Sequence, residues 1–173
     1  HRDLHSFPTR RSSDLISQLV DGGRKRIAMI NHDLSYKYAR LRERGYKSVL
    51  HLRDLDYQAV EYARDLSSSA GMAAMQNLLK DNPPDAVFAV SDTLAAGALR
   101  AIQQVGLRVP EDIAVVGFDG TELAEMISLT TIEQPSRDIG RKAVDLLLNK
   151  IDNPDAPTER VMLDWRFISR AST

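Results

Sequence analysis

The hydrophobic positions of the chain fall into two alternating patterns. Short continuous apolar runs are typical of strands in a parallel sheet covered on both faces. Longer stretches with apolar residues every three or four positions are typical of amphipathic helices. The expected strands are Arg26–Ile30, Val60–Ala63, Asp85–Val90 and Ile113–Gly117, and the expected helices are Tyr36–Leu52, the stretch from Ser67 to Leu79, and Asp92–Val105. Strands that alternate with helices predict βαβ units with right-handed crossovers, and therefore a doubly wound α/β fold.

Local signals set the expected ends of these helices. Ser67 and Asp92 are residue types that cap helix N-termini, because their side-chain oxygens accept hydrogen bonds from free backbone amides. Pro83 and Pro84 end one helix, and Gly106 ends the next.

The end of the chain departs from this alternation. Leu129–Pro135 is expected to be extended, and Ser136–Ile151 is a strongly amphipathic helix. Asn153–Pro157 is a loop, and Arg160–Ile168 is either one strand or two short ones.

The first fifteen residues, His1–Leu15, show neither helical nor strand periodicity. Residues His1–Asp14 match the translation of a widely used short-read sequencing adapter, and the adapter permits Leu15 as well. We therefore expect residues 1–15 to be a non-native tail and the natural sequence to start near Ile16. The alternative is a flexible basic arm, since Arg10 and Arg11 lie among polar residues.

Composition restricts the possible functions. With 173 residues, 43% of them hydrophobic, the chain can bury one core. A net charge of −1 lacks the basic excess expected of a domain that holds DNA by itself. The absence of cysteine excludes disulfides and thiolate metal sites. We find no metal spacing among the histidines, no catalytic constellation and no phosphate loop, so we expect no metal, no cofactor and no enzymatic activity.

Five segments carry a resemblance to a known family. They are Arg42–Tyr46 (R-x-x-G-[YFW]), Pro84–Asp92 followed by Ala96–Ala98, Val109–Asp119 (P-x-D-[IV]-x-[VI]-[VI]-G-[FY]-[DN]), Leu129–Pro135 (L-T-T-[IV]-x-Q) and the closing Ser169–Thr173 (R-x-S-T). Each motif is weak alone, but the ordered set is specific. From about Leu19 to Thr173 the chain resembles the effector-binding domain of LacI/GalR-type transcription regulators.

This resemblance implies a fold of the type I periplasmic-binding-protein kind, with two α/β subdomains around a sugar-sized cleft. One subdomain would be nearly complete and the other mostly missing. The implied divisions are residues 16–128 as the C-terminal effector-binding subdomain, 129–135 as a crossover, 136–157 as a remnant of the N-terminal subdomain, and 158–173 as the return crossover and final strand. The DNA-reading helix-turn-helix would lie upstream.

The resemblance also implies a binding site. Arg42 would donate paired hydrogen bonds to vicinal hydroxyls, unless it belongs to a solvated basic face. Asp119 follows a strand of the expected sheet, where ligands of open α/β sheets bind, although it could be a turn residue.

Five weaker candidates complete this predicted site. Ser91 stands where the family usually has asparagine, and helix capping alone could explain Asp92. Leu66 replaces an aromatic residue that stacks on the effector, so binding could be weaker or the ligand different. Gln134 is a polar contact or an ordinary edge residue, and Tyr38 points to the pocket or to solvent.

The predicted function is that of a cytoplasmic sensor that binds a sugar or sugar derivative and shifts operator binding through the missing N-terminal domain. A homodimer is expected, with Asp92–Val105 and the segment Thr121–Ile127 supplying part of the interface; its apolar residues Leu123, Met126 and Ile127 could instead be core. The runner-up is a periplasmic sugar-binding protein of a transport system, and an α/β enzyme comes third.

Overall fold

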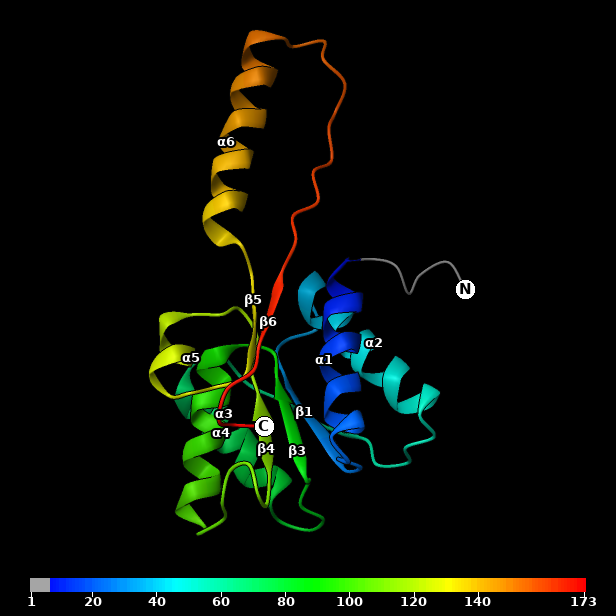
Figure 1. Cartoon of the computed structure of the whole chain (residues 1–173), viewed down its shortest axis with the longest axis vertical. Helices are drawn as coiled ribbons and strands as arrows, with labels where there is room; N and C mark the ends of the chain where they lie inside the picture. Colours follow the sequence, from blue (N-terminus) through cyan, green and yellow to red (C-terminus); the bar gives the residue numbers. More distant parts are fainter. Residues whose placement is uncertain (1–6) are drawn as a thin grey trace.

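The structure is a computed structural model, and it describes residues 7–173, with side chains from residue 12 onward. Helices and strands alternate along most of the chain (Figure 1). The elements are α1 (Phe7–Asp21), β1 (Ile27–Asn31), α2 (Lys37–Leu52), β2 (Ala59–Tyr62), α3 (Ser68–Leu78), β3 (Ala86–Ala89), α4 (Asp92–Gln104), β4 (Ala114–Val116), α5 (Glu122–Met126), β5 (Thr131–Glu133), α6 (Ser136–Asp152) and β6 (Arg166–Ile168).

The main sheet is parallel and has the strand order β2-β1-β3-β4. Every residue of β1, β3 and β4 is buried, because helices cover both faces of the sheet. Helices α1 and α2 pack together, and α3 packs against α4 (Figure 1). The predicted α/β class with a parallel, doubly wound sheet is therefore confirmed.

Helix α1 differs from the sequence-based expectation. We expected residues 1–15 to lack periodicity, but α1 begins at Phe7 and continues to Asp21. Leu15, Ile16 and Leu19 are buried in the core, and together they form an apolar stripe at helical spacing. The expectation of no helical order is wrong for residues 7–15, while residues 1–6 lie outside the described part. The proposed adapter origin of the segment stays a prediction.

Serine side chains cap both helices of the α3–α4 pair. The Ser67 hydroxyl accepts a hydrogen bond from the amide of Ala70, as the sequence predicted. At α4, however, the cap is Ser91, whose hydroxyl accepts from the amide of Leu94. The expectation that Asp92 caps α4 is wrong, because Asp92 is the first helical residue and its carboxylate points elsewhere.

Two glycines let α3 and α4 approach closely. A Cβ atom added to Gly97 would lie 2.0 Å from the carbonyl oxygen of Ser68, and one added to Gly71 would lie 2.2 Å from that of Leu94. Because both obstacles are backbone atoms, no side-chain rotation would relieve either contact.

The C-terminus is fixed to the edge of the sheet. The amide of Val115 donates to the carbonyl oxygen of Ser172 at 2.8 Å, and the Ser172 hydroxyl donates to the carbonyl of Val115 at 2.6 Å. The amide of Thr130 donates to the same hydroxyl at 2.8 Å. Buried Ser172 thus joins β4 to the segment that leads into β5, which gives the closing R-x-S-T motif a structural role.

Helix α6 projects away from the rest of the molecule, and residues 153–165 return beside it without regular structure (Figure 1). No residue of α6 is buried. A strand was expected over Arg160–Ile168, but only Arg166–Ile168 form one, paired antiparallel with β5. Residues 160–165 have no strand beside them, so their backbone forms no hydrogen bonds to a neighbouring strand.

Candidate functional site

The candidate site lies where parallel strands end. Arg42 projects from α2 and meets Asp119, which follows β4, with 3.5 Å between Nη2 and Oδ1. Ligands of open α/β sheets bind beyond these carboxyl ends. The structure thus brings together the two main residues that the sequence singled out.

The Arg42 side chain is held rigidly. It is buried, and its Nη1 donates to the carbonyl oxygen of Val90 at the end of β3. Its guanidinium lies 3.6 Å from the centre of the Phe118 ring and 5.1 Å from that of Tyr38. A guanidinium with rings on its faces presents hydrogen-bond donors at its edge, in a fixed plane. The alternative of a solvated basic face does not apply to Arg42.

Asp119 sits in an unfavourable environment for a carboxylate. Its backbone has a φ of 117°, a region that non-glycine residues rarely occupy. Burial raises the pKa of Asp119 above its usual range, although Arg42 and Gln134 partly oppose this shift. The side chain remains 35% exposed, so one side of the carboxylate can meet a ligand.

Gln134 contacts Asp119 directly. Its Nε2 donates to Oδ1 of Asp119 at 2.7 Å, and its backbone amide donates to the carbonyl of Asp119 at 3.2 Å. The crossover residue is thus part of the constellation, and it orients the carboxylate of Asp119.

Asp92 has its acceptor atoms occupied inside the protein. It is 1% exposed, and its Oδ1 accepts from the hydroxyl of Thr131 at 2.6 Å. Oδ2 accepts from the amide and hydroxyl of Thr121, at 2.7 and 2.9 Å. Asp92 therefore joins α4 to the segments before α5 and in β5. Ser91, which caps α4, is also largely committed to the backbone.

Leu66 is exposed in the loop after β2. Its predicted place in the site stays a prediction.

The sequence analysis missed an aromatic cluster of His32, Tyr36 and Tyr38, of which it singled out only Tyr38. His32 stacks on Tyr36 with ring centres 5.0 Å apart, and Tyr36 lies 5.7 Å from Tyr38. The hydroxyl of Tyr38 is 2.7 Å from Nδ1 of His32. The three rings lie between the end of β1 and the first turn of α2, which was a usable signal because such sheets bind ligands beyond the ends of their strands.

The expected interface residues lie on and just after α5. Met126 is exposed, so it is not core, whereas Ile127 is half-buried and packs against the core. Leu123 is half-buried. The dimer itself stays a prediction.

The side chains of the cluster are of the types that hydrogen-bond to polar groups. Arg42 supplies donors and Asp119 acceptors on adjacent sides of one small region.

Across residues 7–173, no group of three or more metal-ligating side chains is placed to hold an ion. In the same range, no helix has the length and apolar character needed to cross a membrane.

Comparison with known proteins places this geometry in a family. Residues 16–173 match the model of the periplasmic binding protein-like domain. The chain is 38% identical over 165 residues to the ribose operon repressor of Escherichia coli K12, covering 92% of this chain and 50% of the repressor. The chain thus spans half the length of that relative.

Solved structures agree. A crystal structure of an uncharacterized protein from Actinobacillus succinogenes is 47% identical, with a TM-score of 0.91 over 96% of this chain and 62% of that one. A LacI family transcriptional regulator from Enterococcus faecium with bound ribose is 29% identical, with a TM-score of 0.89 over 96% of this chain and 63% of that one. The chain therefore belongs to the family of periplasmic binding protein-like domains, in the form carried by LacI-family transcriptional regulators.

Proposed function

We propose that this chain is the effector-binding domain of a LacI-type transcription regulator, and that its effector is a sugar held by Arg42 and Asp119. The observation that carries the proposal is the meeting of these two side chains, with Gln134, at the carboxyl ends of β3 and β4. A guanidinium edge donates to hydroxyl oxygens and a carboxylate accepts from hydroxyl protons, so the pair suits vicinal hydroxyls.

The energetics of Asp119 support a binding role. Its folded-state pKa is raised, so the folded chain binds this proton more tightly than the unfolded chain does. The free energy of unfolding therefore falls as the pH rises from about 3.9 through the folded-state pKa. At higher pH, the ionised Asp119 carboxylate lowers the stability of the fold. Asp119 thus carries a charge that lowers the stability of the fold, on a backbone whose φ is unfavourable for a non-glycine residue. Both features are typical of functional sites.

Calorimetric titration with ribose tests the proposal. Asp119→Asn keeps the shape of the side chain but removes its charge, and should weaken ribose binding about ten- to a hundredfold. Because the ionised form costs stability, this variant should unfold at no lower a temperature than the parent chain.

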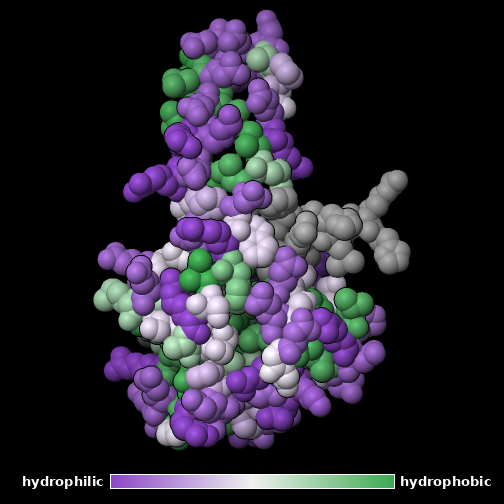
Figure 2. All heavy atoms as spheres, viewed as in Figure 1, coloured by the Kyte–Doolittle hydropathy of each residue, from purple (hydrophilic) through white to green (hydrophobic). Residues whose placement is uncertain are grey.

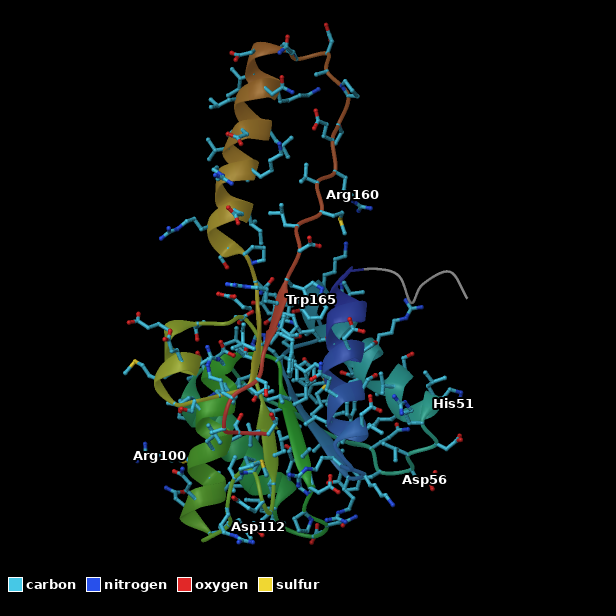
Figure 3. All side chains as sticks on the ribbon, viewed as in Figure 1. His51, Asp56, Arg100, Asp112, Arg160 and Trp165 are labelled. Atoms are coloured by element: carbon cyan, nitrogen blue, oxygen red, sulfur yellow. The ribbon has the colours of Figure 1, made fainter. Side chains whose placement is uncertain are left out.

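A matched control is available at the other end of the sheet. Asp112 forms an exposed ion pair with Arg108 at 2.8 Å, and it lies at the end of the sheet opposite α6 (Figure 3). Asp112→Asn should leave ribose affinity unchanged. Equal ribose affinity in the parent chain and Asp119→Asn would contradict the proposed site.

The remaining parts of the proposal follow from the same role. A sensor needs no catalysis, and the ribose operon repressor and the Enterococcus faecium protein are named as transcription regulators. Contact with operator DNA would come from a separate domain, and the location would be cytoplasmic.

We also propose a homodimer that uses the surface at α5. Met126 is 77% exposed beside the half-buried Leu123, which leaves an apolar patch in water. Met126→Glu should shift sedimentation of the chain toward the monomer while leaving its circular dichroism spectrum unchanged. A dimer that persists in this variant would place the interface elsewhere.

A further inference from the structure

Helix α2 lies at the outside of the molecule and carries basic side chains along its outer face (Figure 1). Four exposed residues, which we call the basic stripe, follow one another at intervals of three or four positions: Lys37, Arg40, Arg44 and Lys47. At about 100° and about 1.5 Å per residue, they fall within an arc of about 80° and extend over about 15 Å. Arg42 is buried on roughly the opposite side of α2, so the basic stripe is separate from the proposed sugar site.

The charge of the basic stripe is not balanced within α2. The only acid in this helix is Glu43, and it is buried. Its carboxylate accepts hydrogen bonds from the side chains of Asn31, Tyr62 and Lys47, at 2.8, 3.1 and 2.6 Å. One carboxylate offsets at most one of the four positive charges. A chain with a net charge of −1 therefore concentrates positive charge on one face of one helix.

The basic stripe borders a hollow in the surface. The hollow has a volume of about 470 Å³ and is lined by Leu34, Arg40, Glu43, Arg44, Lys47 and Ser48. Arg40 is held in place there, because its Nη1 donates to the carbonyl oxygens of Leu34 and Ser35. Carbonyl oxygens fix the guanidinium but do not neutralise its charge. Leu34 is 39% exposed, so this surface combines cations with an open apolar side chain.

Among anionic partners, the structure favours a protein over a membrane or a nucleic acid. The apolar face of α2 is buried in the core, so the helix has none to insert into a bilayer. Nucleic acids present dense rows of phosphates, and a chain of net charge −1 gains little from them overall. A helix with acidic residues three and four positions apart places carboxylates at the spacing of the basic stripe. Such a segment can also supply an apolar side chain for Leu34.

We propose that the basic stripe is a docking surface for an acidic helical segment of a partner protein. Carboxylates of the partner pair with Arg40 and Arg44, and one of its apolar side chains enters the hollow beside Leu34. Each exposed ion pair contributes little, so the affinity comes from several pairs together and falls as salt is added. This surface goes beyond the sensing of a sugar and does not depend on it.

Two labelled peptides test this inference. One is a fluorescein-labelled helical peptide with glutamates three and four positions apart around a central leucine, and in the other glutamine replaces every glutamate. By fluorescence anisotropy, the chain should bind only the glutamate peptide, and more weakly as NaCl rises from about 10 to about 150 mM. The double variant Arg40→Gln/Arg44→Gln should weaken this binding about two- to thirtyfold.

A matched control lies on another helix. Arg137 and Arg141 are exposed in α6 with the same four-residue spacing, and Arg137→Gln/Arg141→Gln should leave the affinity for the glutamate peptide unchanged. Circular dichroism checks the fold of both double variants. If Arg40→Gln/Arg44→Gln unfolds, Lys37→Gln at the first residue of α2 gives a milder test, with a smaller loss of affinity expected.

Three outcomes would overturn the inference. Equal binding of the two peptides would show that the surface does not recognise carboxylates. Equal losses of affinity in the α2 and α6 double variants would show that binding follows net charge rather than the basic stripe. A DNA duplex that displaces the glutamate peptide, and whose own binding is lost in Arg40→Gln/Arg44→Gln, would assign the basic stripe to nucleic acid instead.

Discussion

Helices α4 and α6 have similar amphipathic patterns but opposite environments. In α4, Leu94, Ala98 and Ile102 are fully buried between α3 and the sheet. In α6 no residue is buried, and apolar side chains gather along its surface in the projecting part of the molecule (Figure 2). An amphipathic pattern defines which face of a helix is apolar, but only the elements opposite that face decide whether it is buried.

The largest expected effect comes from a matched pair of leucines. Leu50 in α2 is 0% exposed, whereas Leu147 in α6 is 60% exposed. Leu50→Ala should lower the free energy of unfolding by about 2–5 kcal/mol, because it leaves a cavity. Leu147→Ala should change it by no more than about 0.5 kcal/mol. Denaturant unfolding of both variants checks this. Equal losses would show that the apolar face of α6 is packed in solution.

A matched pair of glycines sharpens the same contrast. Gly97→Ala places a methyl group 2.0 Å from the Ser68 carbonyl and should lower the free energy of unfolding by about 1–3 kcal/mol, because α3 and α4 must separate. A Cβ atom at Gly140 meets nothing within 4 Å, so Gly140→Ala should raise the stability of α6 by about 0.5–1 kcal/mol.

Thermal unfolding measures the loss of stability in Gly97→Ala. Circular dichroism measures the gain of helical content in Gly140→Ala. A Gly97→Ala variant as stable as the parent would mean that the two helices do not cross so closely.

The sequence predicted the sheet because its strands are buried on both faces. Continuous apolar runs such as Ala86–Ala89 indicate buried strands of a parallel sheet, and therefore the α/β fold class. It could not predict the helix from Phe7, since polar residues there dilute the pattern and burial of Leu15 and Ile16 depends on α2. It also could not show that residues 160–165 lack a strand, because pairing depends on a partner that periodicity does not reveal.

The site was predictable only in part. Arg42 and Asp119 followed from their motifs and from the position of ligands in α/β sheets. Capping propensity made Asp92 the expected cap, but Ser91 precedes it and takes that role, which frees the Asp92 carboxylate for Thr121 and Thr131. Ring stacking between residues four positions apart, as in His32 and Tyr36, depends on loop geometry that no periodic pattern encodes.

The pH dependence of ribose affinity tests the central claim most directly. Asp119 must be ionised to accept sugar hydroxyls, and burial raises its pKa above the usual range. Affinity should be full at neutral pH and should fall as the pH drops through that raised pKa, beginning above about 3.9. In Asp119→Asn, affinity should be lower at neutral pH and should lack this acidic decline. The same decline in both proteins, or constant affinity in the parent chain, would contradict a role for the Asp119 carboxylate in binding.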